Sequence, residues 1–146
     1  MEQVVRSLVQ ADAAVVATLE REARVALLEQ RGGPEHLGER PPVGDWAALS
    51  TVAGQHVWVA TIDGVVLGYL QLQIVGNAAE VLQVYVDPEA REIGFGDWLL
   101  EAALAAARSM GCTVLEGTAL PGDRHTKNLY ERAGIKARKI IVSTSL

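Results

Sequence analysis

Arg91, Gly94 and Gly96 form an Arg-x-x-Gly-x-Gly pattern whose residue types suit the binding of an anion. Glycines let backbone N–H groups approach a ligand closely, and the unpaired N–H groups and dipole at a helix start favour negative charge. A diphosphate group fits this chemistry. The pattern is short, and glycines also begin helices merely to turn the chain, so the elements around it decide between the two interpretations.

The common phosphate-binding loops do not match residues 91–96. A nucleoside-triphosphate P-loop ends in Gly-Lys followed by Ser or Thr, and a dinucleotide-binding loop reads Gly-x-Gly-x-x-Gly. Neither order of residues occurs at this place in the chain. The pattern therefore predicts a diphosphate site of another kind.

The predicted elements around the pattern are a strand before it and a long helix after it. Residues 81–86 are rich in β-branched and aromatic side chains, and Asp87-Pro88 ends the strand because proline donates no ladder hydrogen bond. Residues 95–110 carry apolar side chains on one helical stripe. A further strand at 112–118 follows this helix, so we expect it to run parallel to the strand at 81–86.

The rest of the chain predicts a sheet flanked by helices. Strands at 56–62 and 65–75 are joined by Asp63-Gly64, a strong hairpin signal. A turn at Gly76-Asn77 then leads to the strand at 81–86, so three consecutive antiparallel strands are predicted. The polar positions of the first helix, which include Glu20, predict a solvated face. The other expected elements are a strand at 3–8, a helix from Asp12 to about residue 32, a short helix at 45–49, a helix at about 124–133 and a last strand at 137–144.

Length and composition fit a single domain covering residues 1–146. Of the 146 residues, 49% are hydrophobic, which is enough for a buried core. The formal net charge is -5 without a cluster of Lys and Arg, which argues against a nucleic-acid-binding surface. The single cysteine, Cys112, indicates a reducing compartment, and no apolar run approaches the length of a membrane span. We therefore expect a cytoplasmic protein whose partners are neither nucleic acid nor membrane.

In these features the chain resembles the GNAT superfamily of N-acetyltransferases. That family carries Gln/Arg-x-x-Gly-x-Gly/Ala after its fourth strand, preceded by Val-x-Pro, which here are residues 91–96 and Val86-Asp87-Pro88. A second family motif, Leu/Phe-Tyr-Glu followed by Gly-Phe, is matched by Leu129-Tyr130-Glu131 and Gly134-Ile135. The resemblance covers nearly the whole chain and implies an α/β (α+β) GNAT fold. That fold has a mixed sheet of six to seven strands, antiparallel at first and parallel between the fourth and fifth strands, flanked by about four helices.

The resemblance also implies acetyl-CoA as the cosubstrate and no metal. The strand backbone near Val84 and Val86 would pair with the pantetheine arm, and Asn128 in the last helix could reach CoA. Asp123 only loosely matches the family's usual Asn. The pyrophosphate would be cradled by Arg91, Glu92, Ile93, Gly94, Phe95 and Gly96.

Tyr130 is the candidate catalytic acid, because the resemblance places it beside the sulfur of CoA. A phenol within hydrogen-bond range can protonate or stabilise the thiolate that leaves when an amine attacks the thioester. The other interpretation is a helix-face tyrosine that only packs on the sheet. Glu80 is the candidate general base by analogy with the family, and Asp45, Glu116 and bulk water are alternatives.

Together these features predict an N-acetyltransferase that moves an acetyl group from acetyl-CoA to a primary amine of a small molecule or protein. The amine would attack directly in a ternary complex. A non-catalytic acyl-CoA-binding sensor or scaffold of the same fold is the alternative, whereas a toxin acting on charged tRNA is disfavoured by the acidic balance. No pattern identifies the acceptor, and the resemblance suggests a homodimer.

Overall fold

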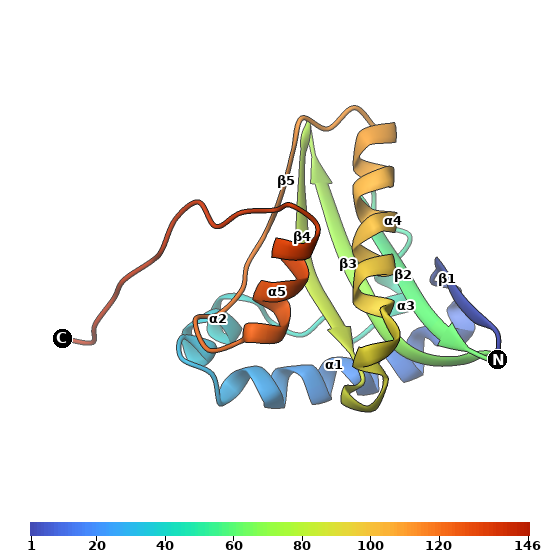
Figure 1. Ribbon diagram of the computed structural model, residues 1–146, viewed down its shortest axis with the longest axis horizontal. Helices are drawn as coiled ribbons and strands as arrows, with labels where there is room; N and C mark the ends of the chain where they lie inside the picture. The colour runs from blue at the N-terminus through green and yellow to red at the C-terminus, as the bar shows by residue number, and fades with distance from the viewer.

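A mixed sheet of five strands runs through the centre of the computed structural model, which describes all 146 residues (Figure 1). The strands are β1 (Gln3–Ser7), β2 (Gln55–Ile62), β3 (Val65–Val75), β4 (Ala78–Val86) and β5 (Val114–Gly117). They lie in the sheet in this same order. The first four pair antiparallel and β5 pairs parallel with β4, which confirms the predicted mixed sheet.

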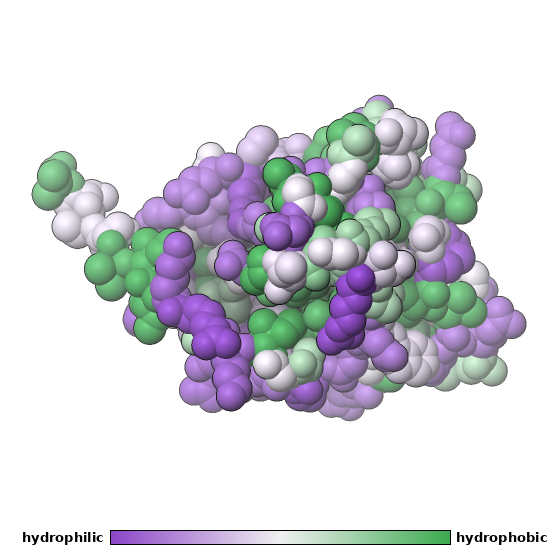
Figure 2. All heavy atoms as spheres, turned by 90° about the horizontal axis from the view of Figure 1, so that it is seen from above, coloured by the Kyte–Doolittle hydropathy of each residue, from purple (hydrophilic) through white to green (hydrophobic).

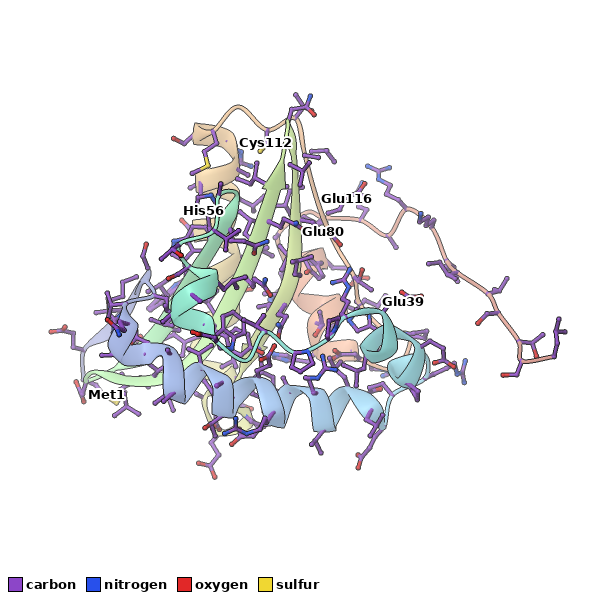
Figure 3. All side chains as sticks on the ribbon, turned by 180° about the vertical axis from the view of Figure 1, so that it is seen from behind. Met1, Glu39, His56, Glu80, Cys112 and Glu116 are labelled. Atoms are coloured by element: carbon purple, nitrogen blue, oxygen red, sulfur yellow. The ribbon has the colours of Figure 1, made fainter.

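Helices cover both faces of this sheet. The helices are α1 (Ala13–Leu28), α2 (Gly33–Glu39), α3 (Trp46–Leu49), α4 (Phe95–Ser109) and α5 (Arg124–Arg132), with two short 3-10 helices, η1 (Gln10–Asp12) and η2 (Pro88–Ile93). Helices α4 and α5 lie on one face (Figure 1). Helices α1, α2 and α3 lie on the other face, which is turned toward the viewer in Figure 3. No helix combines the length and the apolar character needed to cross a membrane.

The larger of two hydrophobic cores lies under α4 and α5. Helix α4 contributes Leu99, Leu100, Ala103 and Ala107, which recur at helical spacing and are all buried. The small alanine side chains let the helix backbone approach the sheet closely. Leu99 is fully buried, so its truncation to alanine would cost about 2–5 kcal/mol of stability.

The smaller core lies between α1, α3 and the opposite face of the sheet. Trp46 of α3 is fully buried there and meets the ring of Tyr69 edge-on, with the ring centroids 5.2 Å apart. One strand serves both cores because successive side chains of a strand point to opposite faces. In β3, Tyr69 faces α1, whereas Leu70 and Leu72 face α4.

The turn between β2 and β3 is a two-residue hairpin, as predicted. Asp63 and Gly64 both have positive φ, 49° and 83°. Positive φ at both central residues is the geometry that a type I′ turn needs, and it matches the right-handed twist of the strands. The predicted hairpin is confirmed.

The sheet is smaller than predicted, with five strands instead of six to seven. Residues 137–144, expected to close the sheet, form no strand, and the segment extends away from the rest of the chain (Figure 1). No backbone hydrogen bond joins it to β5. A strand is stabilised by pairing with a neighbour, so an unpaired segment does not become one however suitable its residues.

The helices also differ from the prediction, which had about four. Five α-helices are present, because the segment rich in proline and glycine after residue 32 contains α2. Pro34 stands in the first turn of α2, where its missing N–H has no intrahelical partner to lose. Strand β5 has only four residues, fewer than the expected 112–118.

Candidate active site

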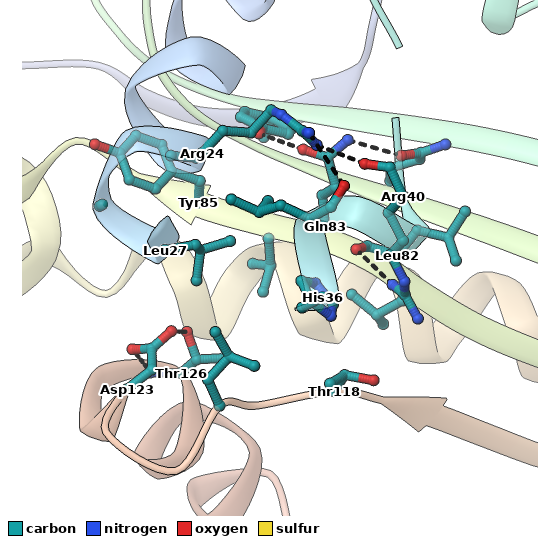
Figure 4. Close-up of a pocket in the computed structure, with 18 of the residues that line it drawn as sticks. Arg24, Leu27, His36, Arg40, Leu82, Gln83, Tyr85, Thr118, Asp123 and Thr126 are labelled. Carbon is teal, nitrogen blue, oxygen red and sulfur yellow. Dashed lines mark hydrogen bonds between the residues drawn. The ribbon is translucent and has the colours of Figure 1, made fainter. Parts of the chain in front are cut away.

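A cleft of about 470 Å³ lies where β4 and β5 separate, bordered also by α1, α2 and α5 (Figure 4). The two strands are paired only from Ala78 with Val114 to Val81 with Gly117. Beyond Val81, β4 continues while the chain after β5 turns away toward α5. The cleft therefore exposes one edge of β4 inside a concave, partly apolar site, the usual setting for a small-molecule ligand.

The exposed edge of β4 carries backbone groups that are available for pairing. A bulge in β4 leaves Leu82 without a partner on β3, because Val81 pairs with Leu72 and Gln83 pairs with the adjacent Gln71. Asp87 donates its N–H to the carbonyl of Leu67, so Asp87 belongs to a hydrogen-bonded pair with β3, as do Tyr85 and Gln83 at alternate positions. Antiparallel pairs alternate between bonded and non-bonded, so the N–H and C=O groups of Val84 and Val86 point away from β3 into the cleft.

Two arginines hold the ends of this edge. Arg40 donates from Nη1 to the carbonyl of Leu82 at 3.1 Å, as Figure 4 shows, and Arg91 donates from Nε to the carbonyl of Val86 at 3.1 Å. The two carbonyls are four positions apart along β4, which is about 13 Å of strand. The groups of Val84 between them stay open, and this gap can accept an extended ligand as an added strand.

The glycine pattern lies at one end of the cleft, where η2 passes into α4. Gly94 has a φ of 94° and directly precedes α4, and no side chain caps the first turn of that helix. Its first N–H groups therefore lack intrahelical partners. Arg91 stacks over the ring of Tyr85, 5.6 Å from the centroid, and its two Nη groups make no hydrogen bond within the chain. This end can bind an anion.

Gly96 has a packing role that the sequence pattern does not reveal. A Cβ at this position would lie 3.3 Å from the Cδ1 atom of Leu129, so the glycine lets α5 approach the start of α4. Leu129 is itself buried, and the next residue of α5 is Tyr130. The second glycine of the pattern thereby helps to position Tyr130.

Tyr130 is buried, and its phenol lies against the end of β5. A Cβ on Gly117 would overlap the Oη and Cζ atoms of Tyr130, so only glycine leaves room for the ring there. The phenol makes no hydrogen bond within the chain, yet its oxygen is not sealed from the cleft. Burial raises the pKa of Tyr130, an effect that the charge of Arg40 opposes and that of Glu80 reinforces. The group is therefore a neutral phenol that can donate a hydrogen bond.

Glu80 lies on the same cleft but is paired with a cation. Its Oε2 accepts from Nη2 of Arg40 at 2.8 Å, and its side chain remains 42% exposed. Among the alternatives, Asp45 accepts from the N–H of Ala48 at the start of α3 and does not line the cleft. Glu116 is the neighbour of Glu80 across the parallel pair, on β5 (Figure 3).

The cleft brings together six of the eleven predicted site residues. Phe95 and Ile93 pack into the α4 core, Gly94 supplies only backbone, and Glu92 and Asn128 are exposed outside the cleft. These five do not line the cleft. The six that do are Glu80, Val84, Val86, Arg91, Gly96 and Tyr130.

Glu20, expected on a solvated face of α1, is instead buried beside the cleft, so that prediction was wrong. Its carboxylate accepts from the N–H of Val43 at 3.0 Å, from Nε1 of Trp46 at 3.3 Å and from Nε2 of Gln83 at 2.7 Å. Gln83 in turn accepts from the Tyr69 hydroxyl at 2.7 Å. A buried carboxylate persists where several donors replace its water, and this one fixes the floor of the cleft.

Arg40 is the other residue that sequence reasoning missed. It follows α2 in an irregular segment, and its carbonyl is held by Nη1 of Arg24 at 2.6 Å. A single arginine in a loop gives no periodic or motif signal. Only the structure shows that it bridges α1 to Glu80 and Leu82.

Comparisons with known proteins agree on the family and the fold. Residues 18–135 match the profile described as the Acetyltransferase (GNAT) family. The tetramutant of the BH1408 protein from Bacillus halodurans aligns over 98% of this chain and 99% of its own, with 17% identity and a TM-score of 0.81. The search of curated protein sequences returned no match.

Two further solved structures have the same fold. One is AAC(6')-Iy in complex with the bisubstrate analogue CoA-S-monomethyl-acetylneamine, with 15% identity, a TM-score of 0.73 and coverage of 100% of this chain and 99% of that one. The other is a Trypanosoma brucei acetyltransferase, with 22% identity, a TM-score of 0.71 and coverage of 99% and 100%. At these identities the likeness concerns the fold.

Proposed function

The chain belongs to the Acetyltransferase (GNAT) family, and on that premise we propose that it transfers an acetyl group from acetyl-CoA to a primary amine. The observation that carries the proposal is the arrangement around one cleft. An open strand edge, an anion-binding helix start and a buried neutral phenol all border it. The acceptor attacks directly, with both substrates bound at once.

The residues present fit acetyl-CoA as a cosubstrate that supplies the thioester. The first N–H groups of α4 and the free Nη groups of Arg91 suit its pyrophosphate. The pantetheine arm is extended and contains amides, so the N–H and C=O groups of Val84 can pair with it as with an added strand. This pairing leads the thioester toward Leu82 and Tyr130.

Tyr130 acts as the acid in the reaction. The amine nitrogen forms a bond to the acetyl carbon, the carbon–sulfur bond breaks, and the electron pair leaves on sulfur. The neutral phenol of Tyr130 donates a proton to the departing thiolate, and burial keeps that proton on the phenol at physiological pH. The proton released by the amine passes to water or to Glu80.

One observation favours the alternative of an acyl-CoA-binding module without catalysis. The carboxylate of Glu80 is engaged by Arg40, and the same guanidinium occupies the carbonyl of Leu82. This ion pair ties the carboxylate to Arg40 and competes with any contact between the carboxylate and the amine. In an enzyme, water would then be the principal base.

Acetyl-CoA-dependent thiol release with a panel of primary amines separates the two functions. We expect turnover that falls about 100-fold or more in Tyr130→Phe, with affinity for CoA unchanged within about twofold. Thermal stabilisation by CoA without turnover for any amine would establish the binding module instead. The absence of any affinity for CoA would refute both.

A further inference from the structure

Arg40 places a positive charge inside the cleft. Hydrophilic residues stand at the outer surface, as Figure 2 shows for one face, whereas the side chain of Arg40 lines the cleft and is only 29% exposed. A charge that is partly withdrawn from water acts more strongly on its neighbours, because the effective dielectric constant around it is lower. The groups around Arg40 therefore decide what this charge can do.

The guanidinium of Arg40 keeps much of its hydrogen-bonding capacity. A guanidinium carries five N–H donors, and Arg40 uses two of them, one for the carbonyl of Leu82 and one for the carboxylate of Glu80. The other three N–H groups make no hydrogen bond within the chain. The two contacts fix the guanidinium at the edge of β4, and the remaining donors can bind a further oxygen atom.

This guanidinium lies at the end of β4 to which the thioester is led in the proposed function, on which the present inference rests. Arg40 contacts Leu82 directly, and its charge counteracts the rise in the pKa of Tyr130 that burial causes. Arg40 and Tyr130 therefore act on the same end of the cleft. Arg91, which suits the pyrophosphate, binds the carbonyl of Val86 at the other end.

The other basic residues that line the cleft do not supply a free positive charge at the thioester end. Arg24 donates from both Nη atoms to backbone carbonyls at the end of α2. Burial lowers the pKa of His36 and of His125, so both rings are neutral at physiological pH. Arg40 is thus the cation that can meet a negative charge on the acetyl group.

We propose that Arg40 stabilises the negative charge that forms on the acetyl oxygen when the amine attacks the thioester. As the nitrogen bonds to the acetyl carbon, the π electrons of the C=O bond move onto the oxygen. The guanidinium donates hydrogen bonds to this oxygen and keeps its own protons. When the electrons return and restore the C=O bond, the carbon–sulfur bond breaks and the sulfur takes the proton of Tyr130. Arg40 thus acts on the oxygen and Tyr130 on the sulfur.

Two analogues of acetyl-CoA with the same shape test this charge without any reaction. S-carboxymethyl-CoA carries a carboxylate in place of the acetyl group, and S-carbamoylmethyl-CoA carries a neutral amide. Calorimetry should give the carboxylate a dissociation constant about tenfold or more lower than that of the amide, and Arg40→Met should abolish this preference. Equal affinities in the wild-type chain overturn the proposal. If neither analogue binds and CoA does not bind either, the proposed function is refuted and this inference with it.

Turnover of acetyl-CoA shows whether the charge acts in the transition state. Arg40→Met should lower kcat about 100-fold and change KM for acetyl-CoA less than about threefold, because the oxygen gains its charge only during the reaction. Arg40→Lys keeps a charge without the forked geometry and should recover part of kcat. Arg21→Met, the same substitution at an exposed arginine of α1 outside the cleft, is the matched control and should match the wild-type chain. Wild-type kcat in Arg40→Met overturns the proposal.

A double variant separates this role from that of merely holding Glu80. If Arg40 acted only through the ion pair, Arg40→Met would have no further effect once Glu80→Gln had removed the carboxylate charge. We expect instead that Arg40→Met lowers kcat by about the same 100-fold in the Glu80→Gln background. The loop should stay in place in these variants, because the backbone of Arg40 is bonded to Arg24 and Leu37. Loss of the effect in that background overturns the proposal.

Discussion

Gly117, at the end of β5, leaves the space that the phenol of Tyr130 occupies. A methyl group there would come closer than van der Waals contact to three atoms of the tyrosine, Oη, Cζ and Cε1. The phenol is the rigid end of a buried side chain and cannot yield by rotating a flexible tip. Gly117→Ala must therefore move either the ring or the end of β5.

The expected cost of this substitution follows from overpacking. An extra methyl in a well-packed site costs about 1–3 kcal/mol, which for a chain of this size lowers Tm by about 3–12 °C. A displaced acid also loses its alignment with the leaving group, so we expect kcat to fall about 100-fold. Thermal melts and acetyl-CoA-dependent thiol release measure the two effects separately.

The Tyr130→Phe background shows whether both effects act through the phenol. Without Oη the steric conflict is smaller, so Gly117→Ala should destabilise Tyr130→Phe less than it destabilises the wild-type chain. It should also lower kcat by no more than about twofold further, because residues that act together are not additive. Gly38→Ala, with open space around it on α2, is the control and should be neutral or slightly stabilising. A Gly117→Ala chain with wild-type Tm and kcat would refute the position of Tyr130.

Three other predictions concern the anion site, the floor of the cleft and the start of α1. Arg91→Met should raise the dissociation constant of CoA about 10–100-fold, measured by calorimetry, and leave that of acetyl-pantetheine, which lacks the diphosphate, unchanged. Glu20→Gln should lower the free energy of unfolding, measured in urea, by about 1–3 kcal/mol, because the new amide N–H₂ would face the N–H groups that Glu20 now accepts from. Glu22→Gln, on the exposed face of α1, is the control and should leave the free energy of unfolding unchanged. The hydrogen bonds that Arg6 donates lower the pKa of Asp12 in the folded chain. The stabilisation from these bonds is therefore complete above the pKa of Asp12 in the unfolded chain, near 4, and is lost as the pH falls through the lower folded-state pKa. Asp12→Asn should therefore be about 1–2 kcal/mol less stable at pH 7, with a difference that shrinks below about pH 4 in unfolding experiments.

The sequence predicted those parts of the site that depend on local order along the chain. Val84 and Val86 alternate along β4, and the glycines follow directly, so their relative positions are set by strand and helix geometry. Tyr130 was predicted by a motif that the structure places on the same cleft. Asn128, two residues earlier on α5, faces elsewhere because side chains two apart on a helix do not share a face.

Contacts between distant segments could not be predicted in the same way. Glu20 was expected to be solvated, since a lone glutamate on a helix usually is, but its donors come from the loop after α2, from α3 and from β4. Arg40 reaches Glu80 across forty positions of sequence. The predicted strand at residues 137–144 was wrong, because strand propensity describes the residues of one strand and not whether a second strand lies beside it to pair with.

The amino-acid order by itself determined most of the element types, the hairpin turn and the glycine turn before α4, because each depends on neighbours within a few residues. The parallel direction of the fourth and fifth strands followed from the helix that connects them. The tertiary structure alone decided that β4 and β5 part after Val81, that Gly117 makes room for a buried phenol and that Arg40 pairs with Glu80. The physical reason is that burial, desolvation and ion pairing depend on what lies across the cleft. Those neighbours are brought together only by the packing of α1, α2 and α5 around the sheet.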